Sequence, residues 1–348
     1  MGIDGLKDFL KNKLQRTNFF WTSTGEYKRK TLGVDANNWV YPFIWTNSVE
    51  IQNKGMTEGL KRELLAKVEI QFPGEVGLVF VFDGAPFPLK IQHERRTADV
   101  VHDSSEGIVT AELIRELARI LSEARRIRCI IAPFEADPQL VYLERINAID
   151  CVVTRDVDFI VWGCKEILFD LDDQGNGMKF CSLQSLDYEK LDLKDMIHEE
   201  FVRMCILAGC DYLKRIPKIR KTTPYSLFKK NKIFKNVKMA ITSNTESQIP
   251  KNYWDDFRKA ELVFKHYLVY DTITPGRRIN MTPIDERVAD EMGRDFSFLG
   301  GVEGTVEGDP PEFTVLGEPQ PNGRENVSHI WGKKRKGRGG INKKRKRR

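Results

Sequence analysis

The chain has 348 residues and a formal net charge of +6, from 56 lysines and arginines against 50 aspartates and glutamates. A hydrophobic content of 41% excludes wholesale disorder, and no apolar run is long enough to cross a bilayer. The six cysteines form no C-x-x-C pair, which argues against a zinc site or a disulfide framework. Since no apolar leader opens the sequence, we expect a soluble intracellular protein that contacts no membrane.

Short β-rich runs alternate with helical patterns through residues 1–290, which is typical of an α/β fold with a mainly parallel, twisted sheet flanked by helices. The predicted strands are 31–34, 78–82, 128–131, 151–154 and 167–169. The predicted helices are 5–14, 57–71, 109–124, 135–146, 199–208 and 254–267. Beyond this core, residues 291–331 are rich in Gly, Pro and Glu and indicate a flexible linker, followed by a basic tail at 332–348.

The tail decides the sign of the net charge. It contains no acidic residue and eleven basic ones: Lys333, Lys334, Arg335, Lys336, Arg338, Lys343, Lys344, Arg345, Lys346, Arg347 and Arg348. Without them, 45 basic residues face 50 acidic ones, a net charge of −5. Such a tail is solvated in its free state, and it can serve as a signal for a nuclear-import receptor, as an electrostatic arm for nucleic acid, or as both. We therefore expect the protein in the nucleus.

Acidic residues follow four of the predicted strands. They are Asp35, Asp83, the pair Glu135 and Asp137, and the pair Asp156 and Asp158. Ligands of open parallel sheets bind outside the carboxyl ends of the strands, so these side chains would gather at one edge. Each one alone is explained equally well as a helix N-cap or a first-turn residue. Several crowded anions, however, repel unless a cation lies among them, and Mg²⁺ suits because it binds a few carboxylates and keeps waters and phosphate.

Further charged residues belong near the same crevice. Asp211 follows a helical run and a glycine, so it is either a cap or a seventh metal ligand. Lys90, Arg95 and Arg96 follow Asp83 and would supply positive charge there, or would belong to a solvated helix face.

At these residues the chain resembles the flap endonuclease superfamily of structure-specific 5′ nucleases, and within it most closely the exonuclease 1 branch. The resemblance covers about residues 1–283. It is carried by Met-Gly-Ile-x-Gly-Leu at 1–6, Val-Asp at 34–35, Phe-Val-Phe-Asp-Gly at 80–84, Ala-Pro-Phe-Glu-Ala-Asp-Pro-Gln-Leu at 132–140, Thr-Arg-Asp-Val-Asp at 154–158 and Met-Cys-Ile-Leu-Ala-Gly-Cys-Asp-Tyr-Leu at 204–213. Residues 173–177, Cys205 and residues 269–271 favour the exonuclease 1 branch.

The resemblance implies a 5′ nuclease core of PIN-like type with a helix–two-turn–helix DNA-binding element at about 205–235. It also implies two Mg²⁺ ions, for which Mn²⁺ would substitute. Carried over by motif, one metal would be served by Asp83, Glu135 and Asp137, and the other by Asp156, Asp158 and Asp211. Asp35 would bind through water or support the first metal. Lys90 would steady the scissile phosphate, so the expected catalytic residues are Lys90, Asp83 and Asp156. Gly2 would lie where the DNA end is bent.

Two departures from the family concern DNA binding. The interval from Asp83 to Glu135 is short, so the helical arch over the 5′ end must be trimmed, as it is in the Holliday-junction-cleaving branch. The family's second arch arginine has no counterpart at strict spacing, which lands on Thr97. With a gap in the alignment, Arg95 or Arg96 would take its place. The hairpin glycines of the family are replaced here, which removes backbone freedom but adds charge for phosphate. The basic residues of that hairpin are Lys214, Arg215, Lys218, Arg220 and Lys221.

A third departure is that the chain ends soon after the nuclease core, so we do not assume the mismatch-repair partners of exonuclease 1. The sequence thus predicts a monomeric Mg²⁺-dependent 5′–3′ exonuclease or flap endonuclease, acting in DNA repair or replication on duplex DNA with a 5′ end, flap, nick or gap. Water activated between two metals would attack the phosphodiester in line. Two alternatives remain open: a flap or Holliday-junction endonuclease without processive exonuclease action, and a catalytically silent DNA-binding protein on the same fold.

Overall fold

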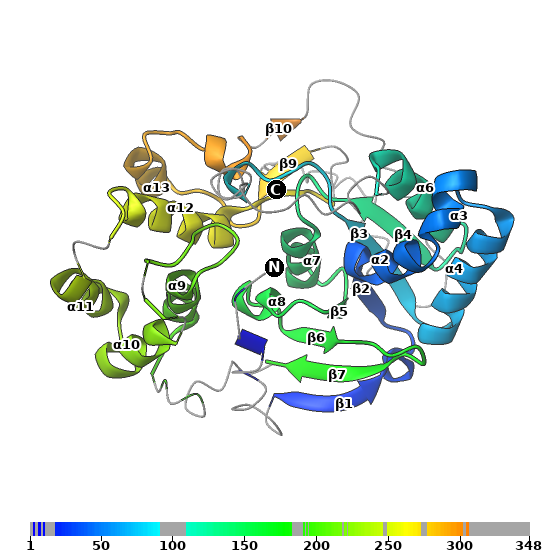
Figure 1. Ribbon diagram of the computed structural model, residues 1–348, viewed down its shortest axis with the longest axis horizontal. Coiled ribbons are helices and arrows are strands. Elements are labelled where there is room, and N and C mark those ends of the chain that lie inside the picture. The colour runs from blue at the N-terminus through cyan, green and yellow to red at the C-terminus, as the bar shows by residue number, and fades with distance from the viewer. Residues whose placement is uncertain are drawn as a thin grey trace, which may run out of the picture.

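The computed structural model describes residues 3, 6–7, 10, 18–90, 109–182, 191, 193, 195–217, 219–220, 222–245, 249–272, 277–301 and 304–305. Within these residues, seven strands form the main sheet (Figure 1): β1 (Phe19–Ser23), β2 (Thr31–Asp35), β3 (Gly77–Phe82), β4 (Ile127–Ile131), β5 (Cys151–Thr154), β6 (Glu166–Phe169) and β7 (Asn176–Cys181). Three more strands form a small antiparallel sheet: β8 (Leu268–Tyr270), β9 (Arg277–Asn280) and β10 (Gly304–Thr305).

The main sheet is mostly parallel, as the sequence predicts. Its spatial order is β1-β7-β6-β5-β2-β3-β4, and the five strands from β6 to β4 run parallel. The strands β7 and β1 extend one edge in antiparallel fashion. Neither was predicted, because each mixes polar and apolar residues and both faces are only partly buried.

Helices cover both faces of this sheet and continue beside it (Figure 1). They are α2 (Ala36–Thr46), α3 (Ser48–Lys54), α4 (Glu58–Gln71), α6 (Ala111–Ser122), α7 (Ala136–Arg145), α8 (Asp158–Val161), α9 (His198–Ala208), α10 (Thr223–Asn231), α11 (Phe234–Thr245), α12 (Tyr253–His266) and α13 (Glu286–Glu291). Short 3₁₀ turns are η1 (Thr24–Tyr27) and η3 (Ser297–Leu299).

The two faces of β3 lie in different hydrophobic cores. Leu78, Phe80 and Phe82 pack with residues of α2, α4 and α6 on one face of the sheet. Val79 and Val81 alternate with them and pack on the other face, in a core that also contains residues of α7, α9 and α12. Because successive strand residues point to opposite faces, the continuous apolar run of β3 is the pattern of a strand buried on both sides.

Side-chain caps set where several helices begin. Thr57 accepts a hydrogen bond from the backbone N–H of Leu60 and starts α4, and Thr110 does the same for Leu113 in α6. These caps place the helices within two residues of the predicted segments 57–71 and 109–124. The prediction missed α2, α3, α8, α11 and α13 and the small sheet, whereas α10 falls within the predicted helix–two-turn–helix element at about 205–235. Most of the predicted helix 5–14 lies outside the described residues.

The folded part of the chain continues past the predicted boundary at residue 290. Helix α13 crosses that position, and Phe298 and Leu299 are buried in the same core as α7 and α12. The boundary at 290 is therefore wrong, because the apolar residues 298 and 299 were assigned to the linker on composition. The remainder of the linker and the basic tail lie outside the described residues.

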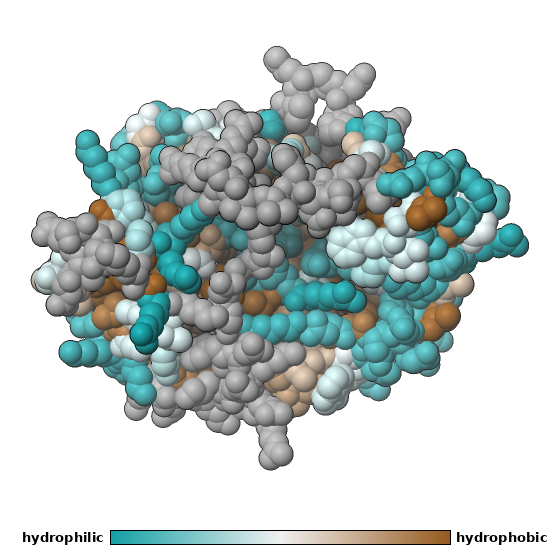
Figure 2. Space-filling view, viewed as in Figure 1, coloured by the Kyte–Doolittle hydropathy of each residue, from teal (hydrophilic) through white to brown (hydrophobic). Residues whose placement is uncertain are grey.

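All six cysteines are free thiols, and Cys129, Cys151, Cys164 and Cys205 are buried. No helix within the described residues is long and apolar enough to cross a membrane. On the face shown in Figure 2, hydrophilic side chains predominate over the coloured part of the surface, and hydrophobic residues form small patches between them.

Candidate metal centre

The predicted carboxylates lie at the carboxyl ends of four neighbouring parallel strands, β5, β2, β3 and β4. Asp35 is the last residue of β2 and Asp83 follows β3 directly. Glu135 is the N-cap of α7 after β4, and Asp137 lies in the first turn of that helix. Asp156 and Asp158 follow β5, with Asp158 as the first residue of α8. Sequence reasoning therefore located this edge of the sheet correctly.

Asp35 is both a helix cap and a member of the acidic group. Its carboxylate accepts from the backbone and side-chain amides of Asn38, and Thr154 Oγ1 donates to its Oδ2 at 2.9 Å. Thr154 Oγ1 also accepts from the backbone N–H of Asp156 at 3.1 Å, so one hydroxyl connects β2 with the acidic loop after β5. Burial, followed by repulsion from Asp83, raises the pKa of Asp35 to about 6.

Asp83 joins the end of β3 to the N-terminus of α7. Its Oδ1 accepts from the backbone N–H of Ala136 at 2.7 Å, and its Oδ2 accepts from Asn37 Nδ2 at 2.6 Å. The N-terminal N–H groups and dipole of a helix favour a negative charge at this place. Even so, desolvation by the surrounding protein raises the pKa of Asp83. Part of the residue remains exposed to solvent. Solvent thus reaches the site at Asp83.

Asp137 is the most poorly compensated carboxylate of the group. Within the described part of the chain it receives no hydrogen bond and forms no ion pair. Burial, and then the negative charges of Asp35, Asp156, Glu135 and Asp83, raise its pKa well above the ordinary value. The acids that repel Asp137 follow β2, β3, β4 and β5, which are neighbours in the sheet, so their charges act on the same place.

Asp156 and Asp158 form the second part of the site. The backbone N–H of Asp158 donates to Asp156 Oδ1, and the backbone N–H of Ile3 donates to Asp158 Oδ1, both at 3.1 Å. Burial, and then repulsion from Asp156, raise the pKa of Asp158 to about 8, and burial also raises the pKa of Asp156. Asp211, after α9, contributes to the repulsion of both.

Lys90 supplies positive charge among these acids. Its Nζ lies 2.5 Å from Glu135 Oε1 and 3.0 Å from Asp211 Oδ2, so it connects the end of β4 with the turn after α9. Burial alone would lower the pKa of the Lys90 ammonium, but the two ion pairs outweigh it and raise that pKa. Lys90 therefore stays charged and holds Glu135 and Asp211 on its two sides.

The seven carboxylates fit a divalent cation by chemistry. They offer oxygen donors, and the raised pKa values of five of them show that the protein alone leaves their charge under-compensated. Among the described residues no three His, Cys, Asp or Glu side chains form a group that would hold a metal ion directly, and Asn38, Asn37 and Lys90 each contact an individual carboxylate. Mg²⁺ is compatible with this arrangement, since it usually keeps several waters and takes one or two carboxylates.

Three polar residues of the site were missed. Asn37 and Asn38 follow Asp35 directly and hydrogen-bond Asp83 and Asp35, and Thr154 bridges Asp35 and Asp156. Two asparagines at the end of a buried strand were an available signal. Thr154 was quoted within a motif, but no role was assigned to it.

The predicted DNA-binding residues are described only in part. Gly2, Arg95, Arg96, Lys218 and Lys221 lie outside the described residues, as does most of the predicted arch. Arg220 is exposed in the segment between α9 and α10, together with Lys214 and Arg215. This segment joins two helices at the position predicted for the helix–two-turn–helix element.

Two models of one protein family match consecutive parts of the chain. The XPG N-terminal domain matches residues 1–102, and the XPG I-region matches residues 126–211, so that together they span more than half of the sequence and include all seven carboxylates. The chain belongs to the flap endonuclease superfamily of structure-specific 5′ nucleases. The family prediction is thus confirmed.

Relatives of this chain include exonuclease 1 proteins. Exodeoxyribonuclease 1 of Schizosaccharomyces pombe is 30% identical over 292 residues, which are 78% of this chain and 50% of the relative. Exonuclease 1 of Arabidopsis thaliana is 27% identical over 321 residues, which are 86% of this chain and 42% of the relative. The chain thus spans about half or less of the length of these two proteins.

Solved structures of the superfamily share the fold. The catalytic core of Rad2 in complex with DNA substrate superposes with a TM-score of 0.53 at 22% identity, covering 75% of this chain and 80% of Rad2. Flap endonuclease-1 from Methanococcus jannaschii gives a TM-score of 0.50 at 16% identity, covering 72% and 83% of the two chains. These matches confirm the α/β 5′ nuclease fold.

Proposed function

We propose that this protein is a Mg²⁺-dependent, structure-specific 5′ nuclease that hydrolyses DNA phosphodiesters in DNA repair or replication. The observation that carries the proposal is the electrostatic convergence of acidic residues from four adjacent strand ends, with Lys90 between Glu135 and Asp211. A purely structural acidic cluster would gain stability by pairing or dispersing these charges. Here instead Asp137 stays uncompensated and Asp83 stays open to solvent.

In phosphodiester hydrolysis, some residues of the site would orient the carboxylates and others would bind the phosphate. Asn37, Asn38 and Thr154 fix the rotamers of Asp83 and Asp35. Lys90 holds a permanent positive charge at the solvent-accessible edge, where a scissile phosphate would pair with it. Divalent cations bound among the carboxylates would supply an activated water and charge stabilisation of the leaving oxygen. We include in the proposal two such ions, and Mn²⁺ as a substitute, because carboxylate ligands suit both metals.

Duplex DNA is the proposed substrate, with a 5′ end, flap, nick or gap. The exposed Lys214, Arg215 and Arg220 support this, because basic side chains on one surface segment attract the phosphate backbone irrespective of sequence. The Rad2 core was solved with a DNA substrate, which agrees with the same substrate class. The protein is further proposed to act as a monomer in the nucleus, delivered by an import receptor that binds the eleven basic residues of 332–348.

A cleavage assay across DNA structures tests the function. Labelled blunt, nicked, 5′-flap and four-way DNAs are incubated with the full chain over a Mg²⁺ titration. Release of short products from 5′ ends supports the exonuclease, whereas single incisions in flap or four-way DNA support the endonuclease alternative. DNA binding without cleavage in Mg²⁺ or Mn²⁺ would establish the silent alternative and refute the proposal.

A matched pair of variants assigns the activity to this site. Asp156→Ala removes a carboxylate at the carboxyl end of β5 and is expected to abolish cleavage while leaving DNA binding largely intact. Asp150→Ala is the control, because Asp150 lies at the opposite end of β5, where it accepts from the backbone N–H of Thr31 at 2.8 Å. Full activity in Asp156→Ala, or equal loss in both variants, would contradict the assignment.

A further inference from the structure

Glu135 accepts hydrogen bonds from the side chains of three residues that lie far apart in the sequence. Its Oε1 accepts from Lys90, while its Oε2 accepts from Tyr212 Oη at 2.6 Å and from Tyr267 Oη at 3.1 Å. Glu135 is the N-cap of α7 but makes no side-chain capping bond, so its carboxylate is free for these distant partners. The two tyrosines are 77 and 132 residues further along the chain.

The direction of the Tyr267 hydrogen bond is fixed by the backbone. The N–H of Glu135 donates to Tyr267 Oη at 3.3 Å, so the hydroxyl oxygen already serves as an acceptor there. The hydroxyl proton is then left for Glu135 Oε2. The Tyr267 hydroxyl therefore forms hydrogen bonds with both the backbone amide and the carboxylate of Glu135, which fixes the Glu135 side chain relative to the start of α7.

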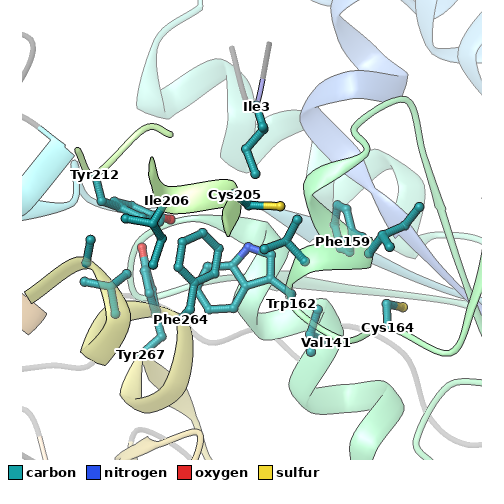
Figure 3. Close-up of a cluster of buried hydrophobic side chains, with 14 of the residues drawn as sticks. Ile3, Val141, Phe159, Trp162, Cys164, Cys205, Ile206, Tyr212, Phe264 and Tyr267 are labelled. Carbon is teal, nitrogen blue, oxygen red and sulfur yellow. The ribbon is translucent and has the colours of Figure 1, made fainter. Parts of the chain in front are cut away.

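Both tyrosine rings are locked by aromatic neighbours. Phe87 stacks on Tyr267 with ring centroids 4.4 Å apart and meets the edge of Tyr212 at 5.6 Å. Trp162 packs edge-on against both rings, at 5.7 Å from Tyr267 and 6.4 Å from Tyr212. In Figure 3 the two tyrosines come from separate segments of the chain, and their hydroxyl oxygens point toward each other beside Trp162 and Phe264. Both tyrosines are buried, so bulk water does not replace Glu135 as the hydrogen-bond partner of either hydroxyl.

The small sheet fixes Tyr267 against α7. Tyr267 lies between α12 and β8, and the next residues of β8 are tied to α7 through Gln139. Gln139 Nε2 donates to the carbonyl of Tyr270 at 3.2 Å, and the N–H of Tyr270 donates to Gln139 Oε1 at 2.7 Å. Glu135 and Gln139 are one helical turn apart, so the C-terminal segment 267–270 runs along the helix that carries two of the acidic residues.

We propose that Tyr267, together with Tyr212, positions the Glu135 carboxylate and thereby sets the affinity of the site for a divalent cation. The inference rests on the proposed function, because it takes Glu135 as a metal-site carboxylate. Partners that orient a ligating group typically change metal affinity about 10- to 100-fold when they are removed. Both tyrosines act through Glu135, so they are positioning residues.

The test compares Tyr267→Phe and Tyr212→Phe with wild type in the full chain. Each variant keeps the ring packing and removes one hydroxyl. Tyr253→Phe is the control, since Tyr253 is a buried tyrosine of α12 whose hydroxyl has no hydrogen-bond partner among the described residues. Mn²⁺ binding to the DNA-free protein is measured by electron paramagnetic resonance of the free ion, and the Mg²⁺ concentration for half-maximal cleavage is measured separately.

We expect Tyr267→Phe to weaken Mn²⁺ binding about tenfold and to raise the half-maximal Mg²⁺ concentration by a similar factor, with kcat recovering at saturating Mg²⁺. The Mg²⁺-induced rise in Tm at a fixed concentration should shrink accordingly. Tyr253→Phe should match wild type in all three measurements. If Tyr267→Phe does not fold, Tyr212→Phe tests the same carboxylate oxygen.

Unchanged cation affinity in both variants, or a lowered kcat that saturating Mg²⁺ does not restore, would overturn the inference. Such a result leaves the proposed function standing as long as the wild type binds the cation and needs it for cleavage. A wild type that cleaves without a divalent cation, or that never cleaves, would instead refute the proposed function.

Discussion

Gly84, directly after Asp83, is expected to be intolerant of any side chain. A Cβ at this position would lie 1.9 Å from the backbone oxygen of Ala132, whereas ordinary contacts begin at about 3.4 Å, so Gly84→Ala requires a relative shift of about 1.5 Å between the loops after β3 and β4. The hydrogen bonds from Gly84 N to Phe134 O and from Ala85 N to Pro133 O, at 2.6 and 3.1 Å, join these loops and would be disturbed.

The size of the effect follows from those contacts. Two backbone hydrogen bonds are worth about 1 kcal/mol each, and overpacking against the backbone costs about 1–3 kcal/mol. We therefore expect Gly84→Ala to lower the free energy of unfolding by about 3–5 kcal/mol, seen as a fall in Tm of about 6–10 °C. Because the loops carry Asp83 and Glu135, a displacement of about 1 Å should also reduce cleavage about 10²-fold.

Thermal melting and cleavage of a labelled nicked DNA check this prediction. Gly74→Ala serves as the control, since a Cβ there would meet nothing within 4 Å and the backbone is not in the left-handed region. The control should keep the Tm and the activity of wild type. A Gly84→Ala protein that melts and cleaves like wild type would show that the loops after β3 and β4 are not packed as described.

Three further outcomes follow from the site. When the metal is chelated, Asp158 binds its proton more tightly in the folded than in the unfolded state, so stability on the order of a few kcal/mol is lost as the pH rises from about 4 through 8. Asp158→Asn should therefore have a higher Tm than wild type at pH 8, but not at pH 4. Lys90→Met leaves Glu135 and Asp211 without their shared cation, so the metal-free Tm should fall while the Mg²⁺-induced rise in Tm grows; a smaller rise would contradict this. Arg220→Ala should weaken duplex binding and reduce the magnitude of the log–log salt slope by about 0.9, measured by fluorescence anisotropy, whereas Arg119→Ala on α6 should not.

The acidic site was predictable because local pattern and topology agree there. Asp35, Asp83, Glu135 and Asp156 each follow a short apolar run, and such runs form buried parallel strands whose carboxyl ends share one edge. Strands β1 and β7 were missed because their mixed pattern resembles that of a loop, and they form only by pairing with each other and with β6. The boundary at 290 was wrong because burial of Phe298 and Leu299 depends on distant helices.

The sequence by itself determined the family, the α/β class and the common edge of the six carboxylates that follow strands, since these depend on residue type and on the order of strands along the chain. Only the tertiary structure decided which acid is paired and which is not. Lys90 reaches Glu135 and Asp211 from far away in sequence, and Tyr267 reaches Glu135 across 132 residues, while Asp137 is left with repulsion alone. Such partners are set by packing of the cores and by the position of the small sheet, which no local pattern encodes.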